Sequence, residues 1–233
     1  MSHDLSEIRT LAEQGHPAAQ FNFGICHLLG EGVEKDAAIA MEWFRAAAEQ
    51  GLAEAAYNLA LGHHHGDGVP QDRGESLRWL RASAAAGYPD ALVNLGILLQ
   101  EGDGVPQDLE RARECYLAAA EESHPIGQYN LAVLYADGIG TEVDHAKAYL
   151  WFHAAAEQGH APAQEALGIA LLHGHGTPID EAEAAHWIRK AAEQGLASAQ
   201  HNLAVLYATG RGLSQDMDQA HHWEALAQGG EAV

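Results

Sequence analysis

The sequence predicts an all-α solenoid made of six 36-residue helix–turn–helix repeats and an N-terminal capping helix. Three columns of residues recur at this step through the 233 residues without a change of register. A fixed period of roughly 20–50 residues is typical of a solenoid, because one such unit cannot bury its apolar face alone. The columns are Gly30, Gly66, Gly102, Gly138, Gly174 and Gly210; Gly32, Gly68, Gly104, Gly140, Gly176 and Gly212; and Asp36, Asp72, Asp108, Asp144, Asp180 and Asp216.

The unbroken period favours one repeat domain over residues 1–233. We expect a cap over residues 1–16, in which residues 5–16 resemble the second helix of an earlier repeat. The repeats are expected at 17–52, 53–88, 89–124, 125–160, 161–196 and 197–233.

The second repeat illustrates the first helix of the unit. Residues 53–65 have helical periodicity, with Ala55, Leu59 and Gly62 on one stripe. Gly66 is placed to end this helix in the left-handed conformation, which glycine adopts without steric cost, and Gly68 helps the chain to turn. The sequence therefore predicts a helix over 53–65 followed by a tight turn.

The aspartate column is placed to begin the second helix of each repeat. An Asp N-cap accepts a hydrogen bond from an unpaired backbone N–H and contributes about 1 kcal/mol. Glu75 would complete a capping box with Asp72, as Glu183 would with Asp180. Gly-x-Gly before a helix can also form a phosphate-binding loop, but its recurrence in six repeats, without lysine or a preceding strand, argues against that function.

Small residues recur on both helices, and tryptophan recurs on the second. Small residues let two helices approach closely, and we expect the tryptophans to pack between repeats rather than stack on a ligand. Cys115 replaces tryptophan in the third repeat. The columns are Gly24, Ala60, Gly96, Ala132, Gly168 and Ala204; Ala40, Ser76, Ala112, Ala148, Ala184 and Ala220; and Trp43, Trp79, Trp151, Trp187 and Trp223.

The charge of the chain restricts its partners. The sequence has 12 Lys+Arg against 33 Asp+Glu, a formal net charge of −21. Nucleic acids and anionic membranes are bound through basic side chains, so neither is an expected partner. A neutral or basic partner fits better, although an acidic surface also serves solubility.

Two features bear on location. Cys26 and Cys115 are too few for a disulfide framework and are expected to be reduced packing residues. The sequence has no segment resembling a signal peptide and no uncharged run of about 18 residues, so we expect a cytoplasmic protein.

The fourth repeat carries the clearest family resemblance. It reads Gln128-Tyr-Asn-Leu-Ala-Val-Leu-Tyr135, Gly138-Ile-Gly140, Asp144, Ala148, Trp151 and Ala154-Ala-Ala-Glu-Gln-Gly159. This pattern resembles the SEL-one-like repeat (SLR), a relative of the tetratricopeptide repeat, over residues 17–230. The resemblance implies a right-handed superhelix of helix pairs whose first helices line a concave groove. It also implies adaptor or scaffold work, and bacterial members include signalling regulators and immunity proteins against secreted effectors.

The first helices carry the candidate binding residues. An asparagine column lies on one face, and the tetratricopeptide resemblance implies that its amides face the groove and hold a peptide backbone. The alternative is that these asparagines join neighbouring helices. Lys and Arg are missing from the first helices, so we expect an acidic groove for a neutral or basic protein or peptide. The candidates are Asn22, Asn58, Asn94, Asn130, Asn202, Glu54, Tyr57, Asp90, Glu101, Tyr129, Asp137 and His201, with Glu165 beside them.

The 16 histidines raise the question of a metal. His63, His64 and His65 are consecutive, and adjacent helical residues point about 100° apart, so they cannot all bind one ion from a regular helix. A frayed end could offer two of them with Asp67 as an adventitious site. We predict no metal and no other cofactor. Protonation of the histidines would reduce the negative charge below about pH 6.5 and weaken a basic partner's binding.

The function predicted is therefore a non-catalytic protein-interaction scaffold or adaptor. No nucleophile motif, paired carboxylates or spaced metal ligands interrupt the repeats, so an enzyme is not expected. Two alternatives remain: an immunity protein that neutralises a toxin, and a hydrolase of the cysteine-rich penicillin-binding branch, whose paired cysteines this chain lacks. A homodimer through the helix around Trp223 is left open.

Overall fold

The structure, a computed structural model, describes residues 5–229 and contains thirteen α-helices and no strand within that range. The all-α prediction, with one capping helix and two helices per repeat, is confirmed. The helices are α1 Leu5–Glu13, α2 Pro17–Leu29, α3 Ala37–Glu49, α4 Ala53–His65, α5 Arg73–Ala85, α6 Pro89–Glu101, α7 Leu109–Glu121, α8 Pro125–Asp137, α9 His145–Glu157, α10 Ala161–His173, α11 Glu181–Glu193, α12 Ala197–Thr209 and α13 Met217–Ala227.

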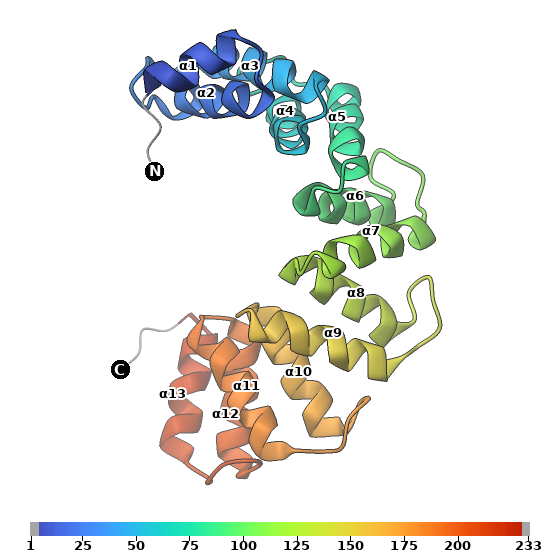
Figure 1. Cartoon of the computed structure of the whole chain (residues 1–233). Coiled ribbons are helices and arrows are strands. Elements are labelled where there is room, and N and C mark those ends of the chain that lie inside the picture. Colours follow the sequence, from blue (N-terminus) through green and yellow to red (C-terminus); the bar gives the residue numbers. More distant parts are fainter. Residues whose placement is uncertain (1–4, 230–233) are drawn as a thin grey trace. The chain divides into compact units, whose positions relative to one another are not determined.

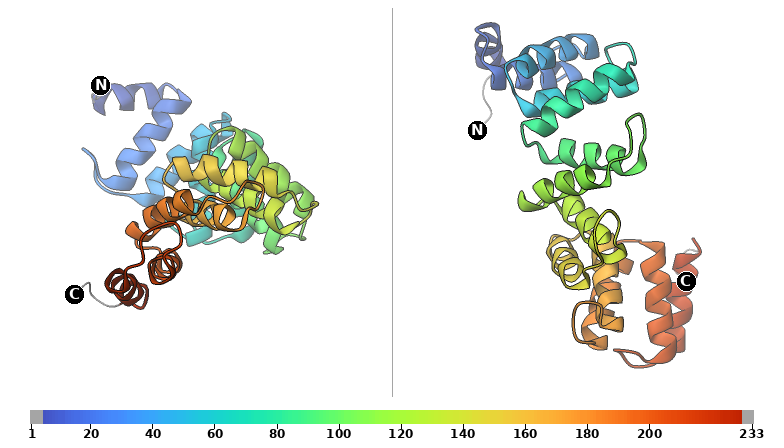
Figure 2. Two further views of the ribbon diagram at one scale, coloured as in Figure 1. Left: turned by 90° about the horizontal axis from the view of Figure 1, so that it is seen from below. Right: turned by 90° about the vertical axis from the view of Figure 1, so that its right-hand side faces the viewer.

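The chain divides into two compact units, the first up to Ala119 and the second from Ala120. Within the first unit, each helix from α1 to α6 packs against its neighbours in sequence, and the same holds from α8 to α13 in the second (Figures 1 and 2). The capping helix α1 packs Leu5, Ile8 and Leu11 against the first repeat around Phe23. Neighbour-to-neighbour packing of this kind is the architecture of a solenoid.

The predicted helix ends are confirmed, with one correction. Each first helix of a repeat ends at a left-handed glycine, such as Gly66 at φ 81°, and the aspartates accept N-cap hydrogen bonds, such as Gly74 N to Asp72 Oδ1 at 2.8 Å. The prediction of a capping box between Asp72 and Glu75 is wrong. The Asp72 N–H donates to the His63 carbonyl at 2.9 Å, and Glu75 instead accepts from the Arg78 guanidinium.

The Asp180 N–H is likewise committed, to the Leu171 carbonyl at 3.1 Å, so Glu183 completes no box there. In both repeats the N-cap N–H donates to a carbonyl of the preceding helix and not to the glutamate of its own helix.

Small residues on the first helices accommodate large side chains of the second helices. A Cβ at Gly24 would fall 2.7 Å from the Phe44 ring, and one at Gly96 would fall 2.6 Å from the Tyr116 ring. Phe44 is 0% exposed and Tyr116 1% exposed, so neither ring has room to move aside. The expected close approach of the two helices is confirmed. The tryptophans are buried or half-buried, and the two cysteines are free.

A buried glutamine network joins successive repeats, and the sequence analysis did not single it out. Gln164 Nε2 donates to the Ala156 carbonyl at 3.1 Å, and Gln164 Oε1 accepts from Gln194 Nε2 at 2.7 Å. Gln20 with Gln50 and Gln128 with Gln158 make equivalent pairs. On α4 and α6 the corresponding residues are Ala56 and Leu92, so the network cannot form there.

The second glycine of each turn brings the turn against the preceding repeat. Gly176 lies at φ 75°, and a Cβ on it would overlap the His145 carbonyl. We call this the turn–helix contact: the residue before the glycine meets the first residue of the preceding second helix. Arg73 and Asp103 form an ion pair in this position, as do Glu181 and Arg211, at 2.5 and 2.8 Å. No described helix is both long and apolar enough to cross a membrane.

Candidate functional site

The asparagine column makes two kinds of contact. Asn94 Nδ2 donates to the Tyr57 hydroxyl at 2.9 Å, and Asn202 Nδ2 donates to Glu165 Oε1 at 2.7 Å. Each bond joins the first helices of two successive repeats, with the acceptor one residue before the asparagine position of the earlier repeat. For Asn94 and Asn202 the amide therefore serves as a helix-to-helix bond.

The other three asparagines make no such bond within residues 5–229. Asn58 Nδ2 donates to the Glu54 carbonyl of its own helix at 2.9 Å, which leaves its amide oxygen available. Asn22 is exposed and Asn130 is half-buried. These three amides keep donor or acceptor capacity that a bound chain could use.

The tyrosines among the candidates report a negative field on the first helices. Burial raises the pKa of Tyr57, and the carboxylate of Asp90 raises it further. Burial also raises the pKa of Tyr129, followed by the charges of Glu165 and Asp137. Both phenols therefore stay neutral in ordinary conditions, and both lie where carboxylates would favour an added positive charge.

The remaining candidates lie at helix ends and edges. Glu54, Glu101 and Asp137 are exposed. His201 Nδ1 lies 2.7 Å from Glu224 Oε2, so it contacts the last helix of the chain. Hydrogen bonds from Gln228 and His201 lower the pKa of Glu224.

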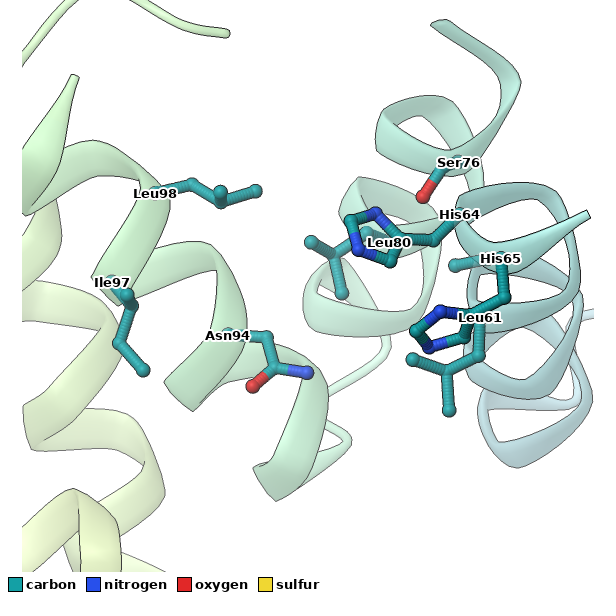
Figure 3. Close-up of a pocket in the computed structure, with 9 residues that line it drawn as sticks. Leu61, His64, His65, Ser76, Leu80, Asn94, Ile97 and Leu98 are labelled. Atoms are coloured by element: carbon teal, nitrogen blue, oxygen red, sulfur yellow. The ribbon is translucent and has the colours of Figure 1, made fainter. Parts of the chain in front are cut away.

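A cavity of about 290 Å³ opens between α4, α5 and α6, and we call it the first cavity (Figure 3). Its apolar wall comes from all three helices, and in Figure 3 the residues of α6 face those of α4 and α5 across it. The apolar lining includes Leu61, Leu80, Ile97 and Leu98, and the polar lining is His64, His65, Ser76 and Asn94.

Two of the predicted histidines thus belong to this cavity. His64 and His65 are exposed, and their rings meet edge to face at 4.8 Å. His63 is 5% exposed, with its Nδ1 3.3 Å from the Pro70 carbonyl. The His63 ring therefore lies in different surroundings from the other two. Among residues 5–229, no three His, Cys, Asp or Glu side chains converge as a metal site would require.

A second cavity, of about 260 Å³, opens between α8, α9 and α10. It lies at the same positions of the repeat, two repeats further along the chain, so that Phe152 replaces Leu80 and Ile169 replaces Ile97. Asp137, His145, Tyr149 and His175 also line it. Of this lining, the sequence analysis named only Asp137 as a candidate binding residue, although the apolar column that includes Ile97 and Ile169 was visible at the 36-residue step.

Comparison with known proteins identifies the repeat. The model of the Sel1 repeat matches residues 17–52, 53–88, 89–124, 125–160, 161–196 and 197–223. The chain is a Sel1 repeat protein. The predicted family is confirmed, and the matched ranges begin where the repeats were predicted to begin.

Solved structures agree with this assignment. This Sel1 repeat protein is 35% identical to a protective antigen of uropathogenic Escherichia coli that displays an SLR fold, with a TM-score of 0.89 over 98% of this chain. The chain spans 49% of that protein's length. A Sel1 repeat protein from Oxalobacter formigenes is 31% identical, with a TM-score of 0.80 over 94% of this chain and 88% of that one.

An immunity protein from Pseudomonas aeruginosa shares the fold alone. It is 19% identical, with a TM-score of 0.54 over 91% of this chain and 80% of that one. No curated protein matches the chain. Sel1 repeat proteins typically serve as protein-interaction scaffolds, and the family is generally non-catalytic.

Proposed function

We propose that this Sel1 repeat protein is a non-catalytic adaptor whose first helices bind a neutral or basic segment of a protein partner. The observation that carries the proposal is the charge of these helices. Their charged residues are all acidic, namely Glu54, Asp90, Glu101, Asp137 and Glu165. A basic segment would gain attraction along this surface, and like charge would repel an acidic one.

The cavities supply anchoring positions on the same helices. At about 290 and 260 Å³, each is smaller than a typical small-molecule site and of the size of one or two large side chains. The four apolar side chains of the first cavity favour a leucine-like or aromatic side chain of the partner. Interfaces commonly concentrate their binding energy in such pockets.

The asparagines have separate parts in this proposal. Asn22, Asn58 and Asn130 contact the partner's backbone, whereas Asn94 and Asn202 mainly hold successive first helices together through Tyr57 and Glu165. Tyr129 and His201 are assigned to the same surface as further partner contacts.

A comparison of one double and one single variant tests this division. Asn58→Ala with Asn130→Ala should weaken partner binding at least tenfold and leave the melting temperature unchanged, because neither amide joins two repeats. Asn202→Ala, at a residue that lines neither cavity, is the matched control and should lower the melting temperature, since it loses a hydrogen bond between repeats.

The partner is first obtained by capture from native lysate and identified, and its affinity for each purified variant is then measured by calorimetry. A separate variant, Ser76→Phe, fills the first cavity and should also reduce the affinity relative to the natural chain. Unchanged affinity in both the Asn58/Asn130 and Ser76 variants would contradict binding on the first helices.

An immunity protein is the second candidate, and the net charge of −21 favours it for a basic toxin. The same surface would then block the toxin's own site. Co-expression distinguishes the two roles: an immunity protein rescues growth when the product of a neighbouring effector gene is expressed, whereas an adaptor leaves toxicity unchanged.

A further inference from the structure

We propose that the second cavity, between α8, α9 and α10, binds a cationic side chain of the partner, an arginine or a lysine, and releases it in acid. This inference rests on the proposed function, since it assigns the chemistry of one anchoring position. It also distinguishes the two cavities, of which the first takes an uncharged apolar side chain.

The lining of the second cavity suits an organic cation. Asp137 supplies a carboxylate at the end of α8, and Tyr149 and Phe152 supply aromatic rings from α9. Lys and Arg do not line it. A cation over an aromatic ring and beside a carboxylate gains from both, and the gain is larger where the site is partly desolvated.

The field of Asp137 reaches the interior of this region. Its charge contributes to the raised pKa of Tyr129, together with burial and Glu165. A positive charge placed in the cavity would be favoured by the same field. The long apolar stem of an arginine or lysine would meanwhile lie against Ile169, which is 37% exposed.

The first cavity differs from the second at the positions that would contact a cation. His65 replaces Asp137, and the lining contains no carboxylate and no Tyr or Phe ring. Asn94 and Ser76 replace Ala166 and Ala148. A cation would therefore gain less binding free energy in the first cavity than in the second. An uncharged side chain would lose less there, because it displaces no water from a carboxylate.

Two histidines, His145 and His175, line the second cavity, and His173 contacts one of them. The His145 and His175 rings stack at 5.0 Å with 16° between their planes, and the His173 and His175 rings lie 5.6 Å apart at 29°. His145 and His175 occupy the turn–helix contact, where Arg73 and Asp103 form an ion pair in an earlier repeat. Ring nitrogens point outward in the plane of each ring, so near-parallel stacked rings do not converge on one metal ion.

The charged and titratable groups around these rings come from each packed element. They are Asp137 on α8, Tyr149 and the Asp144–Lys147 ion pair on α9, and His173 at the end of α10. Imidazole gains positive charge in acid, so lowering the pH adds positive charge beside Asp137 that opposes a bound cation.

The test uses two probes that differ in charge and little in shape: N-acetyl-arginine amide and N-acetyl-citrulline amide. Nuclear magnetic resonance titrations at pH 7.5 should show arginine amide shifting the signals of Asp137, His145 and His175 with about fivefold higher affinity than citrulline amide. Asp137→Asn should remove this preference. Glu110→Gln, an exposed charge loss on α7, is the matched control and should retain it.

Lowering the pH to 5.5 should abolish the preference in the natural chain. The double variant His145→Gln with His175→Gln should keep it, and circular dichroism verifies that each variant is folded. Equal affinity for the two probes, an unaffected Asp137→Asn variant or a preference that survives at pH 5.5 would each overturn the inference.

The outcome is separable from that of the proposed function. If the arginine amide shows no preference while partner binding still depends on Asn58, Asn130 and Ser76, this inference alone fails. If the preference is present but the partner binds elsewhere, the proposed function fails instead.

Discussion

The region α4–α6 and the region α8–α10 occupy the same positions of the repeat and use them for different chemistry. In the first, the buried polar contact is Ser83 Oγ to the Ala53 carbonyl at 2.7 Å, and the turn–helix contact is an ion pair. In the second, the glutamine network joins the repeats and stacked imidazoles occupy the contact. The backbone repeat is thus compatible with several side-chain solutions, and the differences between repeats are where specific binding can arise.

The largest effect should follow from breaking the glutamine network of the second region. Gln164→Leu should lower the free energy of unfolding by about 1–3 kcal/mol, because it removes both hydrogen bonds of the buried Gln164 side chain, to the Ala156 carbonyl and from the Gln194 amide. Urea unfolding followed by circular dichroism measures this. Leucine itself is tolerated at this position, since Leu92 occupies it on α6.

The double variant Gln164→Ala with Gln194→Ala reproduces Ala56 and Ala86, the residues of the first region. It should cost less than the sum of the two single variants, because it leaves no orphaned glutamine. Strict additivity would show that the two side chains are not coupled.

Ser83→Ala is the corresponding change in the first region and should have a smaller effect. The Ser83 hydroxyl is the only polar group lost, and alanine occupies the equivalent position in the neighbouring repeats, as at Ala47. We expect a loss of about 1 kcal/mol, measured by urea unfolding. A loss as large as that of Gln164→Leu would mean that the serine bond, and not burial, holds α5 on α4.

A substitution in the turn before α8 should stabilise the protein, in contrast to the two changes above. Ser123 adopts φ 60°, whereas Gly87 occupies the equivalent place before α6 at φ 83°. A non-glycine residue in the left-handed region costs about 1 kcal/mol, partly offset by the greater freedom of glycine in the unfolded chain. Ser123→Gly should therefore raise the melting temperature by about 1–3 °C. Destabilisation would indicate that the serine side chain makes a compensating contact.

The smallest expected effect is on the pH dependence of stability, and it differs between the two regions. Burial, and secondarily His124, lowers the pKa of His160 from its ordinary value of 6.5, and Tyr88 takes its place in the first region. A lowered folded-state pKa stabilises the protein fully above about pH 6.5, and this contribution is lost as the pH falls toward the folded-state value. Because the ring is only partly buried, the loss should be less than about 1 kcal/mol.

His160→Leu, the residue found at Leu52 and Leu196, should flatten this part of the stability profile between pH 7.5 and 5.5. Calorimetric melting at several pH values measures the slope. An unchanged slope would place the pH dependence on other histidines.

The scaffold was readable from the sequence because its determinants are local and recur. The glycines at helix ends, the aspartate caps and the facing pairs such as Gly24 with Phe44 depend on residues within one repeat or the next. The capping box was wrong because the Asp72 amide has a competing acceptor on the preceding helix, which spacing alone cannot reveal.

The candidate site was readable only in part. The acidic character of the first helices followed from composition, but the separate functions of the asparagines did not. Whether an asparagine bonds across repeats depends on what precedes the column one repeat earlier, Tyr57 for Asn94 and Glu165 for Asn202. The cavities require the packed positions of three helices, so no single segment of sequence encodes them.

The packing of each helix against its neighbours in sequence has a consequence for folding. Within each unit, contacts join residues close along the chain, so forming them closes only short loops. Chains with such low contact order fold rapidly, and folding can nucleate at any well-formed junction and propagate from it. In the second unit the glutamine-linked junctions around Gln164 are the natural starting point, and the last helix, where Glu224 replaces the buried Ile188 of the preceding repeat, is where unfolding should begin.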